Sequence, residues 1–246
     1  FAVSVLESPQ ELTLYRQKSL GIKVDMLRIV QKNLFVEETE MARYLVQTPG
    51  FYLTSISGIG IVLAGQITAE LGNPLDWLPT RNILSYAGVV PRTKQTGGPD
   101  KSPSKGVLPH DCNHILKDYL MQAAQHVGTT HQLSLKCVGL DTQNTLYAYH
   151  QKVLNRGGHS RLATVKKFLK IARILITEQR ILLPEQWLDY GYEVSSEDNL
   201  TYHEAVLKSV KAKWSQYDLS EINDENNFLL REESAIKQLR EFNKKK

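Results

Sequence analysis

The turn from Gly58 to Gly60 is the part of the sequence best suited to binding a phosphate group. Apolar residues at helical spacing lie on both sides of it, between Leu53 and Leu71, which predicts a helix-hairpin-helix. A glycine turn that opens into a helix presents unpaired backbone N–H groups and the positive end of the helix dipole. These groups would hold a phosphate oxygen without reading a base. In the alternative interpretation, the glycines only permit positive φ angles and close helix packing.

A strongly basic loop follows, between Pro91 and Pro109. Its glycines, prolines and hydroxyl residues exclude a core helix or strand. Against the single acid Asp100 it carries Arg92, Lys94, Lys101 and Lys105. Basic loops beside a phosphate-binding turn are natural contacts for nucleic acid, and an idle solvent loop is the alternative.

Charge is distributed unevenly along the 246 residues, whose net charge is +4. Residues 51–184 carry 15 Lys or Arg and seven Asp or Glu, whereas residues 185–246 carry nine and 13. Six of the seven histidines also lie in residues 51–184. This distribution predicts a polyanionic partner for the middle of the chain, because Lys and Arg displace counterions from phosphates. A solvated basic surface is the alternative.

The composition, with 41% hydrophobic and 23% charged residues, is typical of a soluble globular protein. No apolar run is long enough to span a membrane. Cys112 and Cys137 form no CxxC pair, which fits a reducing compartment. Because the chain begins at Phe1 and shows no targeting signal, we expect a fragment or a processed chain located in the cytoplasm.

The periodicity predicts a mainly α fold in three parts. Residues 1–49 form a long helical segment with coiled-coil character, since apolar residues recur every three or four positions for about two heptads. An intermolecular coiled coil and an intramolecular helical hairpin both fit this pattern, and dimerisation is favoured. Residues 50–184 form the helix-hairpin-helix domain. Residues 185–246 form a polar helical extension, which we expect to be peripheral.

Four further helices are predicted to support the turn. They are Thr80 to Ala87 with Gly88 as its stop, Cys112 to Val127 capped by Asp111, Asn144 to Leu154, and a basic helix capped by Ser160 whose inward face is Val165, Leu169, Ala172 and Ile176. The outer face of the last helix could bind a phosphate backbone, although a charged outer face is more often only solvated.

Four segments together resemble the C-terminal transposase domain of the insertion-sequence 110/116/902 family, the bridge-RNA-guided DNA recombinases. They are LTSISGIGIVLAGQITAELG, ILSYAGVVP, QTGG and NHILKDYLMQAA, which start at residues 53, 83, 95 and 113. Their order and spacing agree with the family. Tyr149 to Gly157, followed by the basic helix from Ser160, resembles a further family segment, so the likeness covers roughly residues 50–183. The resemblance implies DNA and a guide RNA as partners.

The resemblance also implies catalytic groups. One is an upstream RuvC-like domain whose DEDD carboxylates bind magnesium; this chain contains no such set, so we expect no metal in it. Another is a nucleophilic serine just before a glycine pair. Thr96 stands at that position, with Ser102 and Ser104 as rivals. Threonine has the required hydroxyl, but its methyl group stiffens χ1 and crowds the attack.

The residues before Asn113 depart from the family, because Pro109 to Cys112 stands where the family has Ser-Lys-x-Gly. Lys105 could supply the basic group from a displaced position. His110 and His114 flank Cys112, but two or three ligands do not make a zinc site. We expect these histidines to lie near phosphates instead.

The predicted nucleic-acid contacts join the turn, the loop and the helices. They are Gly58, Ile59, Gly60, Arg92, Lys94, Gly97, Gly98, Lys101, Lys105, Asn113, Lys117, Arg156, Lys166 and Lys170. The chain is therefore expected to be the nucleic-acid-binding part of an insertion-sequence transposase, oligomeric through its N-terminal helices and without membrane contact. Alone it should bind DNA without cutting it. The alternatives are a non-catalytic tether or transposase relic, and a helical oligomerisation protein.

Overall fold

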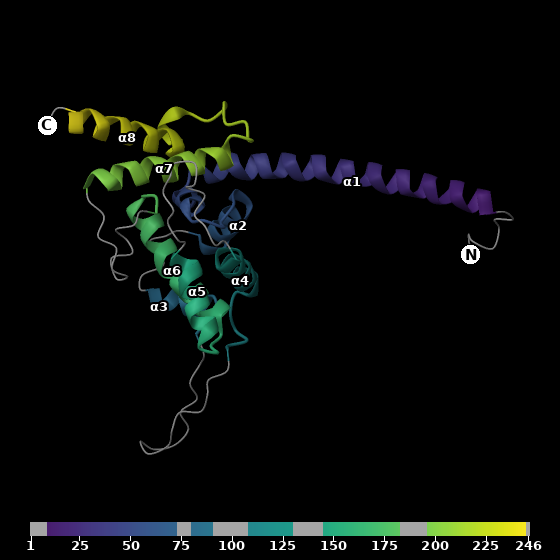
Figure 1. The fold of residues 1–246 in the computed structure, drawn as a ribbon, viewed down its shortest axis with the longest axis horizontal. Helices are drawn as coiled ribbons and strands as arrows, with labels where there is room; N and C mark the ends of the chain where they lie inside the picture. The colour runs from purple at the N-terminus through teal and green to yellow at the C-terminus, as the bar shows by residue number, and fades with distance from the viewer. Residues whose placement is uncertain (1–8, 73–79, 91–107, 130–144, 183–195, 245–246) are drawn as a thin grey trace, which may run out of the picture. The chain divides into compact units, whose positions relative to one another are not determined.

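The regular elements of this computed structural model are all helical within the residues that it describes, which confirms the mainly α fold class (Figure 1). None of these helices is long and apolar enough to cross a membrane. The chain divides into two units, residues 1–40 and 41–246. The structure describes residues 9–72, 80–90, 108–129, 145–182 and 196–244.

The first unit is the greater part of one long helix, α1, which spans Pro9–Leu45. The predicted long helical segment is therefore confirmed. The helix is continuous, so a hairpin within residues 9–45 is excluded. Apolar side chains remain more than half exposed along it, including Leu20, Leu27 and Leu34 at seven-residue spacing.

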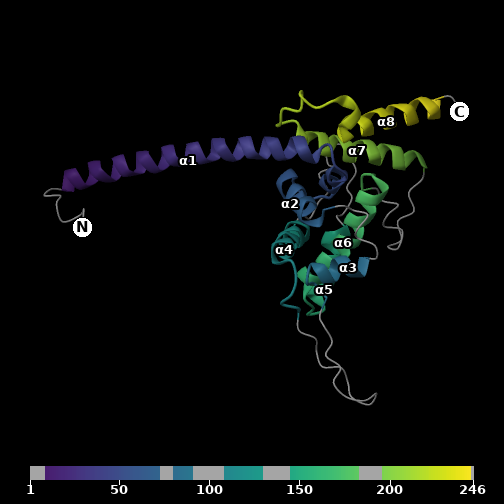
Figure 2. The ribbon, with the colours of Figure 1, turned by 180° about the vertical axis from the view of Figure 1, so that it is seen from behind.

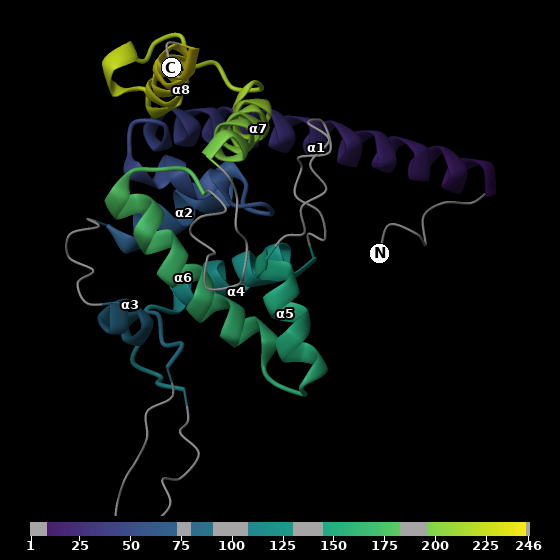
Figure 3. The same cartoon turned by 60° about the vertical axis from the view of Figure 1, so that its left-hand side comes forward.

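The second unit begins with the last turn of α1 and continues through short helices (Figures 2 and 3). α6 packs on α4 and α5, while α2 packs on α4 and on the 3-10 helix η2. The elements are η2 (Pro49–Ser55), α2 (Ile61–Leu71), α3 (Thr80–Tyr86), α4 (His114–Thr129), α5 (Thr145–Asn155), α6 (Ser160–Glu178), α7 (Ser196–Trp214), the 3-10 helix η6 (Asp224–Asn226) and α8 (Phe228–Lys244).

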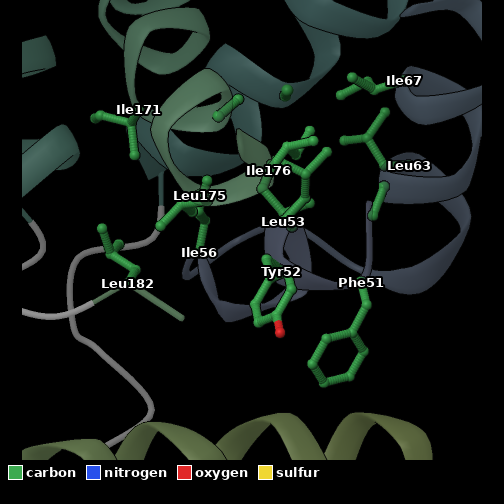
Figure 4. Packing of buried hydrophobic residues seen from close by; sticks show 14 of the residues in the cluster. Phe51, Tyr52, Leu53, Ile56, Leu63, Ile67, Ile171, Leu175, Ile176 and Leu182 are labelled. Atoms are coloured by element: carbon green, nitrogen blue, oxygen red, sulfur yellow. The ribbon is translucent and has the colours of Figure 1, made fainter. Parts of the chain in front are cut away.

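The core of this unit forms where η2 and α2 meet α4 and α6. Figure 4 shows Leu53 and Ile56 beside Leu175 and Ile176 of α6, with Ile67 of α2 nearby. The predicted inward face of α6 is confirmed, because its four residues are at most 2% exposed: Val165, Leu169, Ala172 and Ile176.

The predicted stop of α3 is confirmed. Gly88 has a φ of 62°, in the left-handed region that glycine adopts easily, and Val89 N donates to Leu84 O at 3.1 Å. The glycine also leaves room for Cys112, because a Cβ built at position 88 would clash with its Sγ. This contact brings the residues before α4 against the end of α3.

Two predicted caps are wrong. α4 begins at His114 and its cap is Asn113, whose Oδ1 accepts from Leu116 N at 2.8 Å. Asp111 lies two residues before this cap and therefore outside the helix end. Asn113 N donates to Tyr86 O at 2.9 Å, which fixes the chain immediately before α4. Ser160 is the first residue of α6 and is buried, so the N-cap falls on His159, which makes no side-chain cap.

The C-terminal helices complete the core instead of lying at the periphery. Trp214 of α7 is 1% exposed, and its ring centroid lies 5.5 Å from that of Phe51. Phe228 of α8 contacts the same segment, with its ring centroid 5.4 Å from that of Tyr52. The polar composition of residues 185–246 concealed this role, because a few large aromatic side chains supply the contact.

Candidate nucleic-acid interface

The structure places the predicted turn between two helical segments, the first of which is a 3-10 helix. η2 ends at Ser55 and α2 begins at Ile61. The seven residues of η2 begin at Pro49, whose fixed φ suits the first position of a helix, and end at Ser55, just before the turn. Gly58 has a φ of 92°, a conformation that L side chains rarely adopt, so the turn itself requires this glycine.

Gly60 has a different position in the turn. It is the N-cap of α2 with a φ of −91°, which any residue can adopt, and no side chain caps this helix end. A Cβ built at Gly60 would meet no atom within 4 Å. Because the first N–H groups of a helix have no intrahelical acceptor, an external anion can approach them here.

Ile59 lies between the two glycines and contributes no side chain to this surface. It is 0% exposed and belongs to the hydrophobic core. Only its backbone could take part in the predicted contact.

Lys213 of α7 binds three backbone carbonyl groups in and before the turn. Its Nζ donates to the carbonyl oxygens of Thr54 at 2.6 Å, Ile56 at 3.4 Å and Ile59 at 2.9 Å. Thr54 and Ile56 lie at the C-terminal end of η2, where carbonyls lack intrahelical donors and carry the negative end of the dipole, so a cation is favourable there. Burial lowers the pKa of Lys213 to about 8.

No sequence pattern predicts this role of Lys213. Lys213 lies 154 residues from Ile59, in a segment whose net charge is acidic, and no local motif marks it. The adjacent Trp214 adds a second link between α7 and η2, because its Nε1 donates to Thr54 Oγ1 at 3.3 Å.

A pocket of about 460 Å³, which we call the turn pocket, opens beside the turn. Its volume lies within the range typical of small-ligand sites. Three of its side-chain amides, those of Gln66, Gln122 and Gln216, make no hydrogen bond to any other residue that the structure describes. They come from α2, α4 and the residues after α7. The polar lining of the pocket comprises Gly58, Gly60, Gln66, Gln122, His126, Lys213 and Gln216.

Asn113 lies at the opposite end of α2. Its Nδ2 donates to Glu70 Oε2 at 2.7 Å and to Tyr86 Oη at 2.9 Å. Glu70 belongs to the last turn of α2, roughly 15 Å from Gly60 along the helix axis. Asn113 therefore caps α4 and ties it to α2 and α3, while its contact with nucleic acid stays a prediction.

Four other predicted contacts are cations at three places in the fold. Lys117 lies on α4, Arg156 in the turn after α5, and Lys166 and Lys170 on α6. None of them lines the turn pocket. None forms a salt bridge with an acid in the described ranges, so all four can still neutralise phosphates.

The basic loop lies outside the described residues. This applies to the predicted contacts Arg92, Lys94, Gly97, Gly98, Lys101 and Lys105, and to the hydroxyl residues Thr96, Ser102 and Ser104.

The residues before α4 do not form a metal site in the structure. Cys112 Sγ lies 3.8 Å from His114 Nδ1, while the ring centroids of His110 and His114 are 6.4 Å apart. Across the part of the chain that the structure describes, no three His, Cys, Asp or Glu side chains are grouped to hold a metal ion.

Comparison with known protein families finds a match over the turn and its surroundings. Residues 51–136 match the transposase IS116/IS110/IS902 family. The matched range includes α2, α3 and α4 together with the turn. A search of curated proteins and a search of solved structures gave no match.

Proposed function

We propose, from the match of residues 51–136 to the transposase IS116/IS110/IS902 family, that these residues are a transposase domain whose turn at Gly58–Gly60 binds the phosphate backbone of nucleic acid during transposition. The observation that carries the proposal is the uncapped and sterically open N-terminus of α2 at Gly60. A phosphate oxygen there accepts from backbone N–H groups and meets the positive end of the helix dipole. Such a contact positions a strand and does not read its sequence.

The proposed partners are DNA and a guide RNA. The cations of the middle segment would neutralise further phosphates, both on α6 and in the loop between Pro91 and Pro109. The guide RNA rests on the resemblance of residues 50–183 to bridge-RNA-guided recombinases.

Replacing Gly60 with aspartate tests the phosphate contact. The new carboxylate would cap α2, so the protein should be as stable as the wild type or more stable by a few tenths of a kcal/mol. Its charge would also exclude a phosphate. Affinity for DNA should fall by about tenfold or more, the equivalent of one charge-assisted hydrogen bond. Fluorescence anisotropy across a salt series and urea unfolding measure the two effects.

The matched control is Gln238→Glu, which adds the same charge on the exposed surface of α8, outside the turn pocket. It should leave DNA affinity within about twofold of the wild type, since salt screens an exposed charge that is not part of the site. A folded Gly60→Asp protein that binds DNA as tightly as the wild type would refute the proposed phosphate contact.

A second copy of this chain is the proposed partner of α1. Leu20, Leu27 and Leu34 are spaced by seven residues and are each more than half exposed, as expected for the seam of a coiled coil. Leu27→Glu should weaken association by about tenfold or more, because one buried leucine contributes about 1.5–3 kcal/mol. Sedimentation equilibrium measures this, with Asn33→Glu as the charge-matched control. A wild-type protein of single-chain mass would exclude the dimer.

A hydroxyl nucleophile for strand cleavage completes the proposal. From the resemblance, the Thr96 hydroxyl would attack a DNA phosphorus atom while the P–O bond to one deoxyribose oxygen breaks. That oxygen leaves as a hydroxyl, taking up the equivalent of the proton that threonine loses, and the other part of the cut strand stays bound to Thr96 as a phosphate ester that can be rejoined. The magnesium-binding carboxylates that the resemblance implies belong to another domain, and the described residues contain no replacement for them. This chain by itself is therefore expected to bind DNA and not to cut it.

A further inference from the structure

The turn pocket extends the proposed function of the turn, on which this inference rests. We infer that the pocket receives the base of an unpaired nucleotide whose phosphate lies on the N-terminus of α2. Gly58 and Gly60 line the pocket, so the phosphate site and the cavity are adjacent. One nucleotide can therefore occupy both.

The amide side chains of the pocket suit the edge of a base. Gln66, Gln122 and Gln216 each carry a donor and an acceptor, as the edges of the bases do. Within the described ranges these amides have no hydrogen-bond partner in the protein. A base in a duplex already uses its Watson–Crick edge, whereas an unpaired base offers that edge to side chains.

The rest of the pocket suits the face of a base. Val62 and Leu63 of α2 line it beside the amides, together with the mostly buried Tyr217. Apolar and aromatic groups accept the face of any base, since every base has a π surface. The cavity thus combines an anion site, hydrogen-bonding amides and an apolar wall, which is the chemistry of a nucleotide.

The experiment compares Gln122→Leu with the wild type on three ligands: a single-stranded oligonucleotide, a fully abasic strand of the same length, and a duplex. Gln122 is exposed on α4, so the substitution removes the amide without disturbing the core. Affinity for the base-bearing strand should fall by about tenfold, whereas affinity for the abasic strand and the duplex should not change. Gln125→Leu is the control, because Gln125 is exposed on the same helix but does not line the pocket. Gln216→Leu should repeat the loss from another element.

The outcomes separate this inference from the proposed function. Equal losses on the base-bearing strand, the abasic strand and the duplex would overturn the base site, and so would no loss on any of them. If Gly60→Asp still weakens binding in either case, the phosphate site stands by itself. A wild-type chain that binds none of the three ligands would overturn both.

Discussion

Replacing Lys213 with methionine is expected to lower the free energy of unfolding by roughly 1–3 kcal/mol at pH 7. Methionine keeps the unbranched apolar stem but removes the amine that donates to Thr54 O, Ile56 O and Ile59 O. Ile56 O retains the bond from Ile59 N at 3.1 Å, so the loss falls mainly on the other two carbonyls. We expect this loss to exceed the gain from no longer burying a charge. Urea unfolding measures the difference.

The same variant should change how stability depends on pH. Burial lowers the pKa of Lys213 from 10.5 to about 8 in the folded protein. Between these values the unfolded chain holds more protons than the folded chain, so the free energy of unfolding of the wild type gains a contribution that rises with pH. Lys213→Met should lack this contribution.

Lys208→Met is the matched control for both measurements, because Lys208 is an exposed lysine on the same helix. It should change the free energy of unfolding by less than about 0.5 kcal/mol and keep the wild-type pH profile. If Lys213→Met matched this control in both stability and pH profile, the amine would have no role in holding the turn.

If Thr96 is the nucleophile, as proposed, replacing it with alanine is expected to abolish a covalent protein–DNA intermediate and to slow recombination by a factor on the order of 10³ or more. Alanine has no oxygen to bond to phosphorus. Thr96→Ser should keep the intermediate and form it faster than the wild type, because serine lacks the methyl group that restricts χ1 and the line of attack. Denaturing gels with labelled DNA detect the adduct.

Ser102→Ala and Ser104→Ala distinguish Thr96 from its two rivals. Both should form the adduct at the wild-type level if Thr96 is the nucleophile. Undiminished recombination by Thr96→Ala would instead support the non-catalytic tether, and loss of the adduct in one serine variant would transfer the role to that serine.

Much of the helical framework is predictable because it depends on neighbouring residues. The inward face of α6 follows from apolar residues at helical spacing, and all four of those residues are buried. The stop at Gly88 follows from the backbone freedom of glycine. The caps at Asp111 and Ser160 failed because several nearby polar residues could cap a helix, and tertiary contacts such as Asn113 N to Tyr86 O selected among them.

The sequence by itself determined the mainly α class, the long α1, the glycine turn and the family resemblance, since each depends on patterns within a few turns of chain. Only the tertiary structure decided what surrounds the turn. Lys213 reaches its carbonyls across 154 residues or more, and the turn pocket combines amides from three separate elements. Such partners depend on how the helices pack, because a polar group can pair with any group that packing brings close, however far away it lies in the sequence.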